Sequence, residues 1–63
     1  MIPADVLAAF THFRRRHYEL SPVSLDRALD VPNGSTRAVE SKREVRPETR
    51  EKFVIWNGLE GEA

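Results

Sequence analysis

Three of the four prolines in this 63-residue chain stand directly before an amphipathic segment, and the fourth stands in a turn. Proline is favoured at the first position of an α-helix, where an N–H group has no intrahelical partner, and it cannot continue a helix. Pro3, Pro22 and Pro47 therefore predict three helix starts, whereas the run from Val31 to Gly34 predicts a turn. The positions of these prolines leave room only for short helices and short loops.

Apolar side chains recur at helical spacing in each of the four segments, and no strand pattern competes. Ser21 provides a hydroxyl cap for the second helix. The four predicted helices cover approximately residues 4–19, 22–30, 34–42 and 47–57. We therefore predict an all-α fold, a small four- to five-helix bundle containing a helix-turn-helix, in residues 1–58. Residues 59–63 are expected to form a frayed acidic tail.

The composition restricts what such a chain can do. Ten basic residues balance ten acidic ones, and the chain has no cysteine. Disulfides, thiolate metal sites and cysteine nucleophiles are thus excluded. A chain of 63 residues is also short for forming an enclosed enzyme pocket beside a core. No segment has the pattern of a signal peptide or membrane span, so a cytoplasmic location is expected.

The charges are nevertheless unevenly distributed along the chain. The segment 33–46 contains four cations and two anions, Glu40 and Glu44, so it carries a formal charge of +2. The four cations are Arg37, Lys42, Arg43 and Arg46. A basic face with its compensating acids elsewhere is compatible with binding to nucleic acid.

The segment 20–41 contains the most informative pattern, two short helices joined by a turn. Asn33 and Arg37 carry side chains that can form paired hydrogen bonds with adenine and guanine, respectively. Gly34, Ser35 and Ala38 are small enough to let a helix approach a DNA groove closely. On periodicity alone, an ordinary helical hairpin with a solvated polar face explains the pattern equally well.

The stretch resembles the helix-turn-helix of the Cro and lambda-repressor type, also called the xenobiotic-response-element type. The resemblance extends from about Phe10 to Trp56. Its most specific pieces are Leu20-Ser21, Leu25, Ala28-Leu29, Val31, Ser35, Arg37-Ala38-Val39-Glu40 and Arg46-Pro47-Glu48-Thr49. Three residues depart from the family pattern: Asp30 and Lys42 replace turn glycines, and Arg50 replaces an apolar residue.

The resemblance implies a homodimer that reads double-stranded DNA with the second helix of the motif. The DNA-binding positions it implies are Asn33, Gly34, Ser35, Arg37, Ala38, Ser41, Lys42 and Arg43. It also implies an ion pair between Arg15 on the first helix and Glu40 on the recognition helix. Because Gly34 and Ala38 have no hydrogen-bonding side chains, specificity for the DNA site is expected to depend on DNA shape and phosphate contacts.

The remaining candidates point away from catalysis. His12 and His17 are five residues apart, which misses the spacing that places two metal ligands on one helix face, and no nucleophile motif is present. We therefore expect no enzyme, no metal and no cofactor. The last helix carries two apolar stripes, so Val54 and Trp56, with Leu59, form a candidate dimer surface, although Trp56 would serve equally well as core.

Two functions remain open from the sequence. The first is a small sequence-specific transcription regulator, a Cro-like repressor of phage or mobile-element type that acts by occupying its operator. The second is a protein-interaction module that retains the helix-turn-helix scaffold and inhibits a host enzyme or another regulator. A zero net charge and the absence of hydrogen-bonding side chains at Gly34 and Ala38 favour the second.

Overall fold

The computed structural model of the chain describes residues 2–61, which contain four α-helices and no strand. The helices are α1 (Ala4–His17), α2 (Pro22–Leu29), α3 (Ser35–Glu40) and α4 (Pro47–Trp56). The predicted all-helical class is therefore confirmed. The first and third helices end two residues earlier than predicted, because the backbone turns left-handed soon after each of them.

The local signals in the sequence determine where these helices begin. Ser21 caps α2, since its hydroxyl oxygen accepts a hydrogen bond of 3.1 Å from the backbone N–H of Ser24. Pro22 and Pro47 occupy the first turns of α2 and α4. Each proline fixes φ near the helical value at a position that needs no N–H donor.

Three loop residues that are not glycine adopt the left-handed backbone conformation. They are Glu19, Asp30 and Lys42, with φ of 56°, 56° and 62°. Each lies one or two residues after the end of a helix, and Asp30 and Lys42 are the two positions where the resemblance leads one to expect glycine. The loops thus keep their compact geometry without glycine, at a conformational cost of about 1 kcal/mol for each residue.

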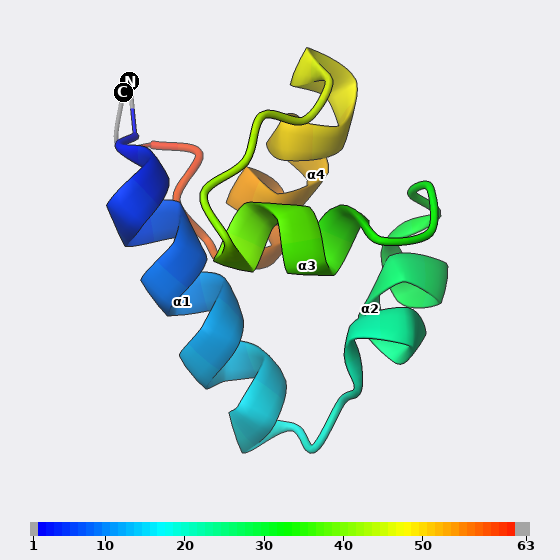
Figure 1. Cartoon of the computed structure of the whole chain (residues 1–63). Helices are drawn as coiled ribbons and strands as arrows, with labels where there is room; N and C mark the ends of the chain where they lie inside the picture. The colour runs from blue at the N-terminus through cyan, green and yellow to red at the C-terminus, as the bar shows by residue number, and fades with distance from the viewer. Residues whose placement is uncertain (1, 62–63) are drawn as a thin grey trace.

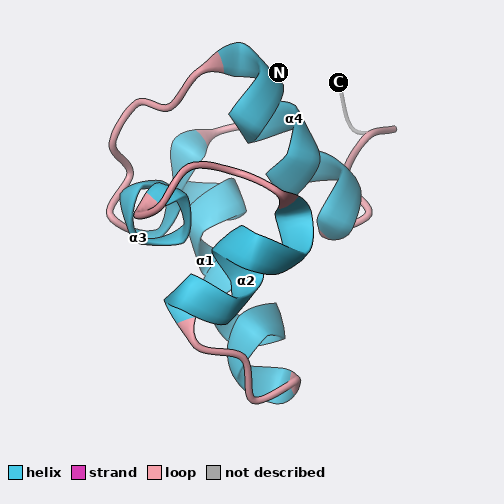
Figure 2. Ribbon diagram, turned by 90° about the vertical axis from the view of Figure 1, so that its right-hand side faces the viewer, coloured by secondary structure: helices cyan, strands magenta, loops and turns pink. Residues whose placement is uncertain are grey.

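The four helices pack around a single core. α1 lies along one side of the molecule. α3 runs across the middle from α1 toward α2, and α2 lies at the end of α3 that is farther from α1 (Figure 1). α3 contacts both α1 and α2, and α4 contacts α1 (Figure 2). The short helix α3 is therefore held between the other elements rather than supported from one side alone.

The core consists of apolar side chains contributed by all four helices and by Ile2, which precedes α1. Its buried apolar residues are Ile2, Leu7, Ala8, Leu25, Val39, Phe53 and Val54. Val54, which the sequence placed on a candidate dimer surface, is only 4% exposed, so that assignment is wrong for Val54. The reason is that adjacent helical positions lie about 100° apart, and the buried arc of α4 is wide enough to include both Phe53 and Val54.

The C-terminal segment folds back onto this core. The backbone N–H of Leu59 donates a 2.9 Å hydrogen bond to the carbonyl of Val54, and the Leu59 side chain packs on the core cluster. Leu59 is thus anchored, although fraying was expected to begin there. Glu60 and Gly61 are exposed, and the last two residues of the predicted tail, 62–63, lie outside the described residues.

The first helix presents apolar residues in two directions. Leu7, Ala8 and Thr11 face the core, whereas Phe10 and Phe13 are 48% and 71% exposed. None of the helices within residues 2–61 is sufficiently long and apolar to span a membrane.

Candidate nucleic-acid interface

The two sides of α3 differ sharply in exposure. Thr36 and Val39 are 0% and 4% exposed and hold the helix against the core. The other side is open to solvent and bears Gly34, Arg37 and Ser41, with Ala38 half-buried. α3 therefore presents one narrow, polar, small-residue strip to any partner.

The start of α3 is fixed by Asp26, a residue of α2 that is only 2% exposed. Its carboxylate accepts hydrogen bonds from the backbone N–H of Gly34 (2.9 Å) and of Thr36 (2.8 Å) and from the Thr36 hydroxyl (2.7 Å). These bonds satisfy N–H groups that the first turn of a helix leaves without partners. Asp26 thus performs the capping role for α3 from a neighbouring helix, and Gly34, which precedes α3, has no side chain to do so.

Sequence reasoning missed Asp26. An aspartate in the middle of a short helix is normally exposed, and its partners are eight and ten residues further along the chain. The only signal in the sequence was an acidic residue on one helix, Asp26, together with a hydroxyl residue at the start of the next, Thr36. That signal is weak without coordinates.

The end of α3 is fixed by the predicted ion pair between Glu40 and Arg15 of α1. Arg15 Nε donates to Glu40 Oε2 at 2.7 Å, and a second guanidinium nitrogen donates to Oε1 at 3.1 Å. The two side chains are only 13% and 16% exposed. Arg15 also donates to the carbonyl of Leu20 at 2.8 Å, and His12 Nδ1 lies 3.1 Å from Glu40 Oε1.

These contacts determine the protonation of Glu40. Burial of the carboxyl would raise its pKa, but hydrogen bonds from Arg15 and His12, together with their charges, outweigh burial and lower the pKa of Glu40. The hydrogen bond to Glu40 in turn raises the pKa of Arg15 above its ordinary value. The pair therefore stays charged at neutral pH and ties α3 to α1.

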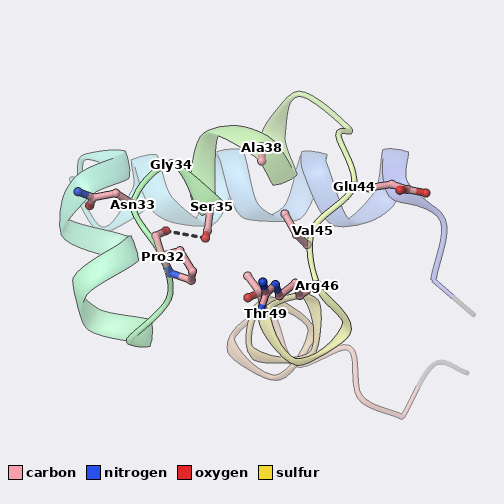
Figure 3. Close-up of a pocket in the computed structure, with 9 residues that line it drawn as sticks. All are labelled: Pro32, Asn33, Gly34, Ser35, Ala38, Glu44, Val45, Arg46 and Thr49. Carbon is pink, nitrogen blue, oxygen red and sulfur yellow. Dashed lines mark hydrogen bonds between the residues drawn. The ribbon is translucent and has the colours of Figure 1, made fainter.

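A shallow hollow lies between α3 and the start of α4 (Figure 3). Ser35, Val45 and Thr49 point into it, whereas Asn33 extends away from it at one end and Glu44 at the other. Ser35 is 7% exposed and its hydroxyl donates to the carbonyl of Pro32 at 2.6 Å. The hydroxyl of Ser35 thus stabilises the turn before α3, and its side chain is not part of the exposed strip.

The ion pair also changes the charge that this region shows to solvent. Because Glu40 is neutralised by Arg15 inside the fold, four exposed cations in segment 33–46 face one exposed carboxylate, that of Glu44, giving +3. The cations are Arg37, Lys42, Arg43 and Arg46. Lys42 lies 3.5 Å from the highly exposed carboxylate of Asp5, a surface contact worth less than about 1 kcal/mol.

The other predicted candidates lie elsewhere in the fold. Trp56 is half-buried against the core, and the guanidinium of Arg14 lies 5.4 Å from the centre of its ring. His12 lies beside Glu40, whereas His17 is exposed at the end of α1. Within residues 2–61, no three His, Asp or Glu side chains gather closely enough to hold a metal ion.

The chain matches no known protein family, no curated protein and no solved structure. Its resemblance to the Cro and lambda-repressor type therefore rests on the residues named above. What the geometry adds is a short helix fixed at both ends, with a cationic segment directly after it.

Proposed function

We propose that the chain is a small sequence-specific DNA-binding regulator in which α2 and α3 form a helix-turn-helix and α3 enters the major groove. The observation that carries this proposal is the fixation of α3 at both ends, by Asp26 at its start and by Arg15 through Glu40 at its end. A recognition helix must hold its side chains in one orientation for base readout, and this arrangement does so with six residues of helix.

The exposed strip supplies suitable groups for the two kinds of DNA contact. Arg37 and Asn33 are exposed and can form paired hydrogen bonds with guanine and adenine. Lys42 and Arg43 follow the helix and are placed to meet phosphates of the backbone. Gly34 and Ala38 allow close approach without adding hydrogen bonds, so DNA shape contributes to specificity.

The proposed activity is occupancy of an operator, which blocks transcription sterically and needs no cofactor. The decisive experiment selects sequences from a random duplex pool and then measures binding of the best site as salt is varied. If the three exposed cations that follow α3 (Lys42, Arg43 and Arg46) contact phosphate, the logarithm of affinity should fall with the logarithm of salt with a slope of about −2.7 per chain. A flat salt dependence, or no enrichment of any sequence, would refute the proposal.

A second function, the inhibition of a host enzyme or regulator through protein contact, is favoured by the formal net charge of zero. On this alternative, the strip containing Gly34 and Ala38 packs against a protein surface instead of a groove. The same salt titration distinguishes the two functions, because a protein-binding module has little affinity for random duplex even at low salt.

A further inference from the structure

One face of α1 is apolar and open to solvent on the side away from α3. Val6, Phe10 and Phe13 are 37%, 48% and 71% exposed and follow one another at spacings of four and three residues. This alternation places the three side chains in one stripe along a helix, which is the pattern of helix-to-helix packing. Contiguous exposed aromatic groups of this kind mark interaction surfaces in soluble proteins.

The apolar face of α1 also borders two hollows. Pro3, Val6, Phe10 and Leu59 line a hollow of about 430 Å³ near the start of α1. Phe10 and Phe13 take part in a second hollow of about 290 Å³ near its end. The ring of Phe13, which lines the second hollow, belongs to the most exposed large apolar side chain within residues 2–61.

The charges around the face differ between its two ends. Asp5 lies in the first turn of α1, and Glu60 follows Leu59, which lines the hollow at that same end. Arg14 and Arg16 lie in the last turn of α1. The contact of Asp5 with Lys42 is exposed and weak, so one end of the face remains acidic while the other is basic. The face is therefore complementary to itself when it is turned end over end.

We propose that this face binds a second copy of the chain, with the two α1 helices antiparallel about a twofold axis near Phe10. In that arrangement Phe13 of each copy stands three residues beyond the axis and meets Val6 of the other, so its ring fills the hollow at the start of the partner helix. Arg16 comes opposite Asp5 of the other copy. An interface of this kind is isologous and closes as a dimer.

The available area makes this a reversible association. A standard protein interface takes about 800 Å² from each partner, which is roughly a fifth of the 4421 Å² surface of the described chain. A helix of 14 residues is about 21 Å long, so α1 and the adjoining Leu59 can cover only part of that area. The two aromatic rings are the residues expected to dominate the binding free energy.

The inference does not depend on the proposed function. His12 and Arg15, which contact Glu40 of α3, lie on the opposite side of α1 from Val6 and Phe10 in helical projection. Association through the apolar face therefore leaves the strip on α3 uncovered. Because Asp5 also contacts Lys42, the variant that separates the two properties is Phe13→Ser and not a change of Asp5.

The first test is sedimentation equilibrium of the full chain over micromolar to near-millimolar concentrations. We expect a monomer–dimer equilibrium that Phe13→Ser weakens at least tenfold without lowering the thermal midpoint measured at low micromolar concentration, where wild type and variant are both monomeric. Val23→Ser is the matched control, because Val23 is a similarly exposed apolar residue, 44% accessible, on α2. A wild-type monomer throughout this range, or equal weakening by both substitutions, overturns the proposal.

The second test addresses the antiparallel orientation. Asp5→Arg and Arg16→Asp should each weaken the dimer several-fold, and the chain carrying both changes should recover most of the loss, because each partner then meets the opposite charge again. Failure of this recovery excludes the antiparallel arrangement. Cosedimentation of a persistent monomer with vesicles of phosphatidylcholine and phosphatidylglycerol would show that the face binds lipid, which also overturns the proposal.

Discussion

Glu40→Ala removes the carboxylate that ties α3 to α1, and its effect on stability can be estimated from the geometry. The substitution deletes two charged hydrogen bonds to Arg15, of 2.7 and 3.1 Å, and the contact of Glu40 with His12. It leaves the Arg15 guanidinium with only the Leu20 carbonyl as a partner. Exposed ion pairs contribute about 0–1 kcal/mol, whereas breaking a buried pair costs about 3–5 kcal/mol. With side chains 13% and 16% exposed, the expected loss is about 3 kcal/mol.

A loss of this size is large for a chain of 63 residues. Globular domains have about 0.05–0.15 kcal/mol of stability per residue, which gives about 3–9 kcal/mol in total here. Since 1 kcal/mol shifts the midpoint of a domain this small by about 4–8 °C, Glu40→Ala should lower the thermal midpoint by at least about 12 °C. The loss of helical circular dichroism on heating measures this directly.

Glu44→Ala is the matched control, because it removes another carboxylate from the same segment, one that is exposed. Its effect should remain within about 0.5 kcal/mol. A double-mutant cycle with Arg15→Ala should then show that the two residues are coupled, with the double variant less destabilised than the sum of the single ones. Equal midpoints for Glu40→Ala and Glu44→Ala, or a cycle without coupling, would refute the reasoning.

Four further outcomes are expected. The fold lowers the pKa of Glu40, so the contribution of this carboxylate to stability is complete above the unfolded pKa of about 4.3 and is lost as pH falls through the lower folded value. The difference in urea midpoint between wild type and Glu40→Gln should therefore shrink between pH 7 and pH 3. Asp26→Ala leaves three donors at the start of α3 without their partner and should cost about 3 kcal/mol in urea unfolding, whereas an unchanged midpoint would show that water replaces the carboxylate. Arg37→Ala and Asn33→Ala should each reduce affinity for a selected DNA site by about 1–3 kcal/mol, and equal losses on random DNA in a gel-shift assay would restrict them to phosphate contacts. Trp56→Ala should lower stability by about 2 kcal/mol in thermal unfolding, since the ring is half-buried on the core, and a stable variant would show that the ring lies outside the cooperative unit.

The secondary structure was predictable because its signals are local. Pro22, Pro47 and the hydroxyl of Ser21 act within one helical turn, and α2 and α4 begin where these residues predicted. The Arg15–Glu40 pair was expected only from the resemblance, since no local pattern connects residues 25 positions apart. Its hydrogen-bond geometry and the contribution of His12 required coordinates.

The errors arise where burial depends on how helices meet. The sequence does not reveal that α4 buries adjacent side chains, so Val54 was placed at the surface, nor that Ser35 uses its hydroxyl in the turn before α3. Likewise, the apolar spacing of α1 is compatible with either stripe facing inward. The structure selects Leu7 and Thr11, and leaves Phe13 outside.

The left-handed residue after α3 creates a conflict between stability and charge. Lys42 has φ of 62°, and glycine at this position would relieve about 1 kcal/mol of backbone strain. The same change would delete one of the four exposed cations in segment 33–46. A variant library selected for thermal resistance alone should therefore accumulate Lys42→Gly, whereas a library selected for nucleic-acid affinity at moderate temperature should retain the lysine. The sequence preference at this single position thus reports which of the two properties is under selection.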